Sequence, residues 1–206
     1  MTSRLITAPA EEPVDLGTFK LHARGPDGPE EDSLLLEKLL AARIHIENEL
    51  ERPLITSTWE LTYTAWPCDY FELLGNTQSV LSVKYTDTAG ALQTLAASNY
   101  KLVRAYDAGS DVAPLRDSSG PSDMRAGRLY CAYGQAWPAE WLDVGEPVAI
   151  QVVAGWKNAA AVPAPIVGYL ELLAANWYRN REISAAAESW ALALPPDVSP
   201  YKIRRF

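Results

Sequence analysis

The sequence has 206 residues, of which 48% are hydrophobic and 21% are charged. This composition is ordinary for a soluble globular protein and excludes wholesale disorder, and the length suits one domain with a sizeable core. The formal net charge of −8 argues against a general nucleic-acid-binding surface, because such surfaces gain affinity by neutralising phosphates with Lys and Arg.

Cysteine usage and hydropathy exclude two further classes. Cys68 and Cys131 lie far apart, with no C-x-x-C spacing and no neighbouring His, so neither a zinc site nor a disulfide framework is predicted. No stretch approaches the roughly 18 continuous apolar residues of a membrane span. The N-terminus lacks the apolar run of a signal peptide, so we expect a protein that is made in the cytosol.

The N-terminal part predicts an arm followed by two helices. Residues 1–14 are expected to form an extended arm or a frayed end. Asp15 can cap a short helix over residues 16–24 that stops at Gly25. A longer helix is predicted from about Ser33 to Arg52, with one apolar stripe made of Leu35, Leu39, Ala42, Ile46 and Leu50.

The longer helix carries more apolar residues than one stripe needs. Leu36, Leu40 and Ile44 widen its apolar side. We therefore expect it to lie between a sheet and a second surface, which can be a neighbouring subunit.

The hydrophobic period then changes from 3.6 to 2, which predicts strands. Residues 55–64 alternate, with Ile55, Trp59, Leu61 and Tyr63 on one face. Residues 80–95 predict a hairpin with Leu81, Val83 and Tyr85 on one face. Further strands are predicted at 100–103, at RLYCAYG and at PVAIQVVAG, and residues 104–127 form a long aperiodic loop that is functional or disordered.

The last predicted element is a helix from Pro163 to Ile183. Ile166, Leu170, Leu173 and Trp177 form its apolar stripe, with Tyr169 and Ala174 beside them. Residues 184–206 are expected to be a weakly structured tail with a basic, aromatic tip. The order of elements predicts an α+β fold, a small antiparallel β-sheet with packed α-helices on one side, two of them N-terminal and one long and C-terminal.

Catalytic and metal-binding patterns are missing. His22 and His45 are the only histidines, and both are interpreted as surface or boundary residues. Asp107, Asp111 and Asp117 lack the spacing of a calcium loop, and Glu47, Glu49 and Glu51 fan around their helix. We predict no enzyme, no cofactor and no metal site.

The seven tryptophans leave a binding module open. Trp59, Trp156 and Trp177 fall on faces predicted to be buried, whereas Trp66, Trp137, Trp141 and Trp190 fall in loops or the tail. Exposed aromatic rings bind sugars and peptides, so a small carbohydrate- or peptide-binding module is the main alternative, and an enzyme is the third.

Three motifs in the second half resemble the head–tail connector, or adaptor, proteins of long-tailed bacteriophages and related phage-like particles. They are Tyr133-Gly134 with Trp137-Pro138, Ala154-Gly155-Trp156, and Pro165-Ile166 leading to Trp177-Tyr178-x-x-Arg181. The resemblance covers roughly residues 13–183, and it departs from the family at Gly17 and in the long 104–127 loop. Its signature and core positions are Trp59, Tyr133, Gly134, Trp137, Pro138, Gly155, Trp156, Pro165, Ile166, Leu170, Trp177, Tyr178 and Arg181.

The resemblance implies a structural virion protein of the neck, made in the host bacterial cytoplasm. Members of the family are similar in forming a ring, generally of twelve copies, that docks below the portal protein and above a stopper or other neck protein. DNA passes through the channel during packaging and ejection, without sequence-specific binding and with no membrane involved. The implied organisation is an N-terminal arm at 1–14, a connector domain at 15–183 and a C-terminal tail at 184–206.

The resemblance also gives the tail to the portal. It makes Tyr201, Lys202, Arg204, Arg205 and Phe206 candidate docking residues, and interfaces are enriched in Arg and aromatic residues. The alternative is a frayed, solubilising end, and the sequence leaves both open.

Overall fold

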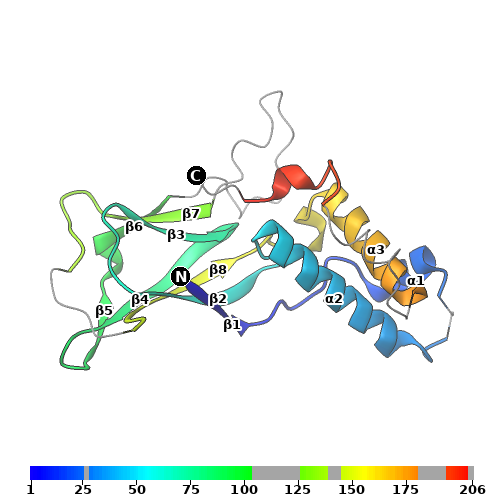
Figure 1. Ribbon diagram of the computed structural model, residues 1–206, viewed down its shortest axis with the longest axis horizontal. Coiled ribbons are helices and arrows are strands. Elements are labelled where there is room, and N and C mark those ends of the chain that lie inside the picture. Colours follow the sequence, from blue (N-terminus) through cyan, green and yellow to red (C-terminus); the bar gives the residue numbers. More distant parts are fainter. Residues whose placement is uncertain (26–27, 104–125, 139–144, 181–193, 204–206) are drawn as a thin grey trace.

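The computed structural model describes all residues except 26–27, 104–125, 139–144, 181–193 and 204–206. Helices gather at one end of the molecule and strands at the other (Figure 1). The helices are α1 (Leu16–Ala23), α2 (Asp32–Leu50) and α3 (Ala164–Arg179). The strands are β1 (Thr2–Thr7), β2 (Ser57–Tyr63), β3 (Tyr70–Gly75), β4 (Thr77–Thr86), β5 (Leu92–Leu95), β6 (Tyr100–Val103), β7 (Ala126–Cys131) and β8 (Val148–Ala154).

The strands form two antiparallel sheets that pack face to face. One sheet has the order β1-β2-β8-β4-β5 and the other the order β3-β7-β6. The core between them joins Leu61, Val83 and Ile150 from the larger sheet to Phe71 and Leu129 from the smaller one. The predicted α+β class is confirmed, with two sheets in place of one.

The helices pack mainly on one another. All five residues of the predicted α2 stripe are buried, and they share a core with Phe19 of α1 and with Ile166 and Leu170 of α3. The expectation that helices cover one side of the sheet is wrong. The second sheet already covers the apolar face of β2 and β8, so the helices bury their stripes against each other.

A short crossing joins the two cores. Ile55 and Trp156 lie directly beyond β2 and β8, and both belong to the helical core. The Trp156 amide donates to the Leu54 carbonyl (3.0 Å), and the Thr56 amide donates to the Trp156 carbonyl (2.9 Å). The strands therefore continue into the helical core through paired backbone.

The N-terminal segment is extended, as expected, but it is not frayed. β1 pairs antiparallel with β2 along its length and forms an edge of the larger sheet. Its side chains are exposed, so burial leaves no period-2 pattern in the sequence. Glu146 accepts hydrogen bonds from Thr2 and Thr62, which ties the strand to the sheet and lowers the pKa of Glu146.

Two other strands differ from their predictions. A β-bulge between Val80 and Ser82 turns Leu81 outward, so Val83 and Tyr85 are buried and Leu81 is exposed. β3 was not predicted, although Phe71 and Leu73 alternate with half-buried residues along it. The predicted hairpin is confirmed as β4 and β5, with the Asp87 carboxylate accepting from the Ala89 and Ala91 amides in the turn.

The described end of the tail is folded onto the domain. A 3₁₀ turn at Ser199–Tyr201 follows Val198, which is buried in the helical core. The Ile203 amide donates to the Leu50 carbonyl at the end of α2, and its side chain is buried. The prediction of a weakly structured tail is wrong for this part.

Candidate functional site

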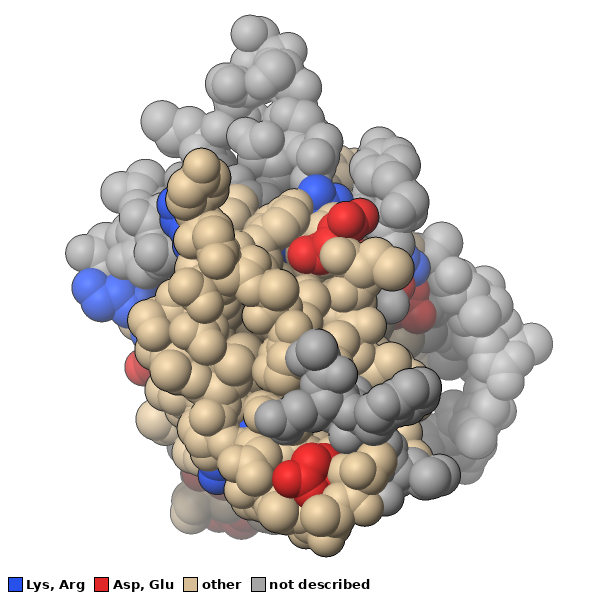
Figure 2. Space-filling model, turned by 90° about the vertical axis from the view of Figure 1, so that its left-hand side faces the viewer, with Lys and Arg blue, Asp and Glu red and all other residues tan. Residues whose placement is uncertain are grey.

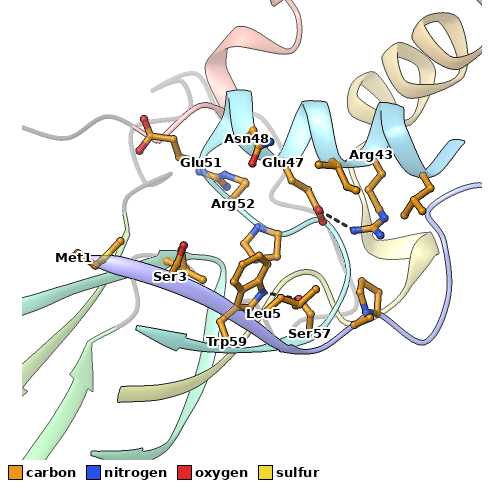
Figure 3. A pocket seen from close by; sticks show the side chains of 16 residues that line it. Met1, Ser3, Leu5, Arg43, Glu47, Asn48, Glu51, Arg52, Ser57 and Trp59 are labelled. Carbon is orange, nitrogen blue, oxygen red and sulfur yellow. Dashed lines mark hydrogen bonds and ion pairs between the residues drawn. The ribbon is translucent and has the colours of Figure 1, made fainter. Parts of the chain in front are cut away.

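A groove lies between β1 and the C-terminal half of α2 (Figure 3). It encloses about 700 Å³ and is open along one side. Ser3 and Leu5 of β1 with Ser57 and Trp59 of β2 form its floor, and α2 forms its wall. Further lining residues include Leu40, Arg43, Ile44, Glu47 and Asn48 on α2.

The polar groups at the back of this groove pair with one another. Arg43 Nε donates to Glu12 and Arg43 Nη1 donates to Glu47, both at 2.8 Å. The other Glu47 oxygen accepts the Leu54 amide at 2.8 Å, and Trp59 Nε1 donates to the Ser57 hydroxyl at 2.9 Å. Burial raises the pKa of Glu47, and the Arg43 charge opposes that rise. These groups are internally satisfied and so present little to a polar ligand.

The rim of the groove is apolar and exposed. Leu40 and Ile44 line it on α2, and Leu36 lies one turn earlier on the helix, outside the lining; each of the three is more than two fifths exposed. Leu5 and Met1 are exposed to a similar degree on the opposite rim. The sequence predicted these α2 residues as an extra apolar surface, and within this chain nothing covers them among the described residues.

The Ala-Gly-Trp motif has a structural role, because it leads the chain from the end of β8 into the helical core. Gly155 has φ +117°, and a Cβ there would lie 2.3 Å from the Ile55 carbonyl carbon and oxygen. Trp156 is fully buried, and the guanidinium of Arg52 lies 5.8 Å from its ring. Arg52 is itself buried, donates to Asn76 at 3.1 Å, and has its pKa lowered to about 10 by desolvation. The sequence did not single out Arg52, which sits between α2 and Pro53.

The α3 motif is structural as well. Pro165 is half-buried in the first turn, and Ile166 and Leu170 are buried in the helical core. Trp177 is half-buried with its ring centroid 5.8 Å from that of His45, and the Tyr178 hydroxyl donates to Glu31. Arg181 lies outside the described residues.

The Tyr-Gly-x-x-Trp-Pro motif lies at the far end of the sandwich. Tyr133 is fully exposed, and Gly134 (φ +76°) allows the tight turn behind it. Trp137 stacks on Trp66 with ring centroids 5.4 Å apart, and Pro138 is half-buried. Figure 2 shows few acidic or basic side chains on the described part of this end.

The two loop tryptophans therefore close the sandwich core. Trp66 also packs on Phe71 and Tyr85, and Trp137 packs on Phe71. Rings held face to face in this way leave no open platform for a sugar between them. Trp141 and Trp190 lie outside the described residues.

The docking candidates are only partly described. Tyr201 is half-buried against the helical core, and Lys202 is exposed with its Nζ 3.8 Å from Glu49. Arg204, Arg205 and Phe206 lie outside the described residues. Among the described residues, the predicted positions form a core and several surfaces in place of one site.

Residues that could bind a metal ion are spread over the described part of the chain. Within it, no three His, Cys, Asp or Glu residues gather to hold a metal ion. Cys68 is exposed, and Cys131 is half-buried. His22 Nδ1 lies 3.8 Å from Glu171. None of the described helices combines the length and hydropathy that a membrane span requires.

We compared the sequence and the fold with those of known proteins. No family model matches the sequence, and no curated protein does. Three similar solved chains come from particles of a gene transfer agent. One, in the neck of the empty particle computed with C6 symmetry, has a TM-score of 0.75 and 25% identity, and covers 100% of this chain and 97% of its own.

The other two agree with it. A chain in the virion of the native particle has a TM-score of 0.72 and 25% identity. A chain in the neck of the native particle computed with C12 symmetry has a TM-score of 0.72 and 24% identity, and both cover 100% of this chain and 97% of their own. Over its whole length, the chain therefore has the fold of a neck protein of a phage-like particle, which confirms the resemblance to the head–tail connector family that its motifs indicate.

Proposed function

We propose that this chain is a structural subunit of the neck of a phage-like particle, the adaptor that joins the portal to the rest of the neck. The full-length similarity to neck chains of a gene transfer agent carries this proposal. The fold also suits it. Several signature residues, among them Trp156, Ile166 and Leu170, build the helical core.

Copies of the chain form a ring, of twelve subunits in our proposal, with DNA passing through the channel. The symmetry of the similar necks, C6 and C12, supports a cyclic arrangement. The net charge of −8 suits a channel wall, because like charges do not trap the polyanion that moves past.

The C-terminal tip docks on the portal. The chain around Ile203 is fixed to the end of α2, so the basic residues that follow start from a defined point on the domain. Arg204 and Arg205 are the strongest candidates because they add two cations beside Lys202 in an acidic protein. Tyr201 contributes to the support of this segment, since it packs on the helical core.

The test is reconstitution with the portal protein produced by the same particle. Native mass spectrometry of the mixture is expected to find a stoichiometric ring of this chain on the portal. A chain that stays monomeric beside an intact portal ring contradicts the adaptor function. The double change Arg204→Glu with Arg205→Glu is expected to abolish docking, whereas Lys101→Glu, on exposed β6, is the matched control. Docking of the tail variant at wild-type strength contradicts the role of the tail alone.

A further inference from the structure

On the described part of the chain, the groove between β1 and α2 exposes a group of apolar side chains that a second protein could cover. Leu36, Leu40 and Ile44 are 46%, 42% and 45% exposed, and Leu5 on the facing rim is 43% exposed. Single exposed apolar side chains are common, but a row at helical spacing beside a 700 Å³ groove is a continuous apolar surface. Such a surface is stabilised when another protein excludes water from it.

The shape and chemistry of the groove favour a protein over a small ligand. It is partly open to solvent, and its lining residues Arg43, Glu47 and Trp59 are already hydrogen-bonded within the chain. A small-molecule site would enclose its ligand and direct free polar groups into the space. An apolar ridge with a few neutral contacts fits this groove instead.

The occupant follows from the symmetry of the similar assemblies. Necks containing this fold were computed with C6 and C12 symmetry, and a cyclic assembly repeats one contact between unlike faces of neighbouring subunits. The groove is concave and cannot fill itself by a two-fold contact with another groove. We propose that it receives an apolar ridge from a different face of the next copy of this chain, an inference that rests on the proposed neck function.

The outer edge of β1 supports the same contact with a neighbouring copy. β1 is an edge of the larger sheet and forms the outer rim of the groove, so its second edge has no strand partner among the described residues. Exposed edges that carry apolar residues promote association with another chain. A neighbour seated on the groove covers this edge as well as the α2 row.

The first test places a photo-reactive benzophenone amino acid at position 40 in particles that contain equal amounts of ¹⁴N and ¹⁵N chain. We expect mixed-isotope crosslinks in which position 40 joins a peptide outside the groove. Crosslinks from position 40 to position 40 of another copy overturn the unlike-face contact. Crosslinks only to the portal or to another neck protein overturn the choice of occupant.

The second test is the double change Leu40→Arg with Ile44→Arg, compared with Leu172→Arg on α3, which is 61% exposed outside the groove. Circular dichroism first checks that each variant keeps the fold, which is expected because all three positions are exposed. The groove variant is expected to lower the amount of ring on the portal at least tenfold, and the control to lower it less than twofold. Equal loss in both variants, or no loss in the groove variant, overturns the proposal.

The two proposals fail in different ways. If wild-type chain is missing from purified necks, the neck function itself is wrong. If wild-type chain is present and the groove variant assembles as well as it does, only the groove contact is wrong.

Discussion

At the scale of single residues, the family signature is mostly a set of packing requirements. Gly155 shows this most directly, since its positive φ and the 2.3 Å approach to the Ile55 backbone leave no room for a Cβ. Trp156 then fills the space where β2 and β8 enter the helical core. The Ala-Gly-Trp motif therefore serves packing, because it lets the chain pass from the sandwich core into the helical core.

We predict that Gly155→Ala destabilises the protein by about 3 kcal/mol or more. The left-handed backbone costs an L-residue about 1–2 kcal/mol, and a clash with main-chain atoms that cannot rotate away adds to it. Urea unfolding measures the change. Gly134→Ala is the matched control, because its φ is also positive (+76°) but no atom lies within 4 Å of the added Cβ. Equal losses at both positions contradict the steric argument.

At the scale of elements, a buried ion pair joins the segment after β1 to α2. The Arg43 side chain is only 8% exposed and bridges Glu12 to Glu47. The sequence does not single out Arg43, because its partner Glu12 lies 31 positions away. The bridge holds the N-terminal segment at the end of the groove, so it fixes the spacing between the two rims.

We predict that Arg43→Met destabilises the protein by about 3 kcal/mol near neutral pH, because it leaves the Glu47 carboxylate buried without its cation. Burial already raises the pKa of Glu47 above its ordinary value of 4.5, and loss of Arg43 raises it further. An acid with a raised folded pKa costs stability only above its unfolded pKa. The loss is therefore expected to shrink as the pH falls through the raised pKa of Glu47, and this contribution is gone once the pH is below the unfolded value of about 4.5.

Chemical denaturation at pH 7 and pH 4 measures this difference. Arg4→Met is the control, because Arg4 pairs with Glu60 at the surface and such pairs contribute about 1 kcal/mol or less. A loss from Arg43→Met that is the same at both pH values contradicts the assignment to Glu47.

The sequence predicts helices and strands correctly where one face of the element is buried. The α2 stripe of Leu35, Leu39, Ala42, Ile46 and Leu50 is buried as predicted, because helix periodicity records burial directly. The helix ends differ from the predicted ones at 24 and 52 by only one or two residues, because left-handed Arg24 and Glu51 end α1 at Ala23 and α2 at Leu50.

The packing partners could not be predicted in the same way. Alternation in β2 and β8 says that one face is buried, but not whether a helix or a second sheet covers it. The second sheet depends on β3, whose apolar positions Phe71 and Leu73 span too few residues to stand out. The groove likewise required the structure, because Leu5 and Ile44 belong to segments that only the fold brings together.

At the scale of the whole molecule, the two hydrophobic cores are separate but are joined by the chain segments next to β2 and β8. The sandwich core contains Leu129 and Ile150, and the helical core contains Leu170 and Trp156. Separate cores can open independently, as distinct cooperative units. Here the segments that extend β2 and β8, at Leu54–Thr56 and Gly155–Trp156, enter the helical core, and backbone hydrogen bonds between them hold the crossing. In the proposed ring, a subunit held between its neighbours benefits from such coupling, since a load on one end reaches the other through the crossing.

We predict that the two cores unfold together. Leu170→Ala in the helical core and Leu129→Ala in the sandwich core each remove a buried side chain, at a cost of about 2–5 kcal/mol. Residue-resolved hydrogen exchange is expected to show that Leu170→Ala lowers the protection of β8 amides by the same free energy as that of α3 amides, and that Leu129→Ala does so in reverse. Leu172→Ala, exposed on α3, is the control and is expected to change neither. Loss of protection confined to the mutated core contradicts the coupling through the crossing at Gly155.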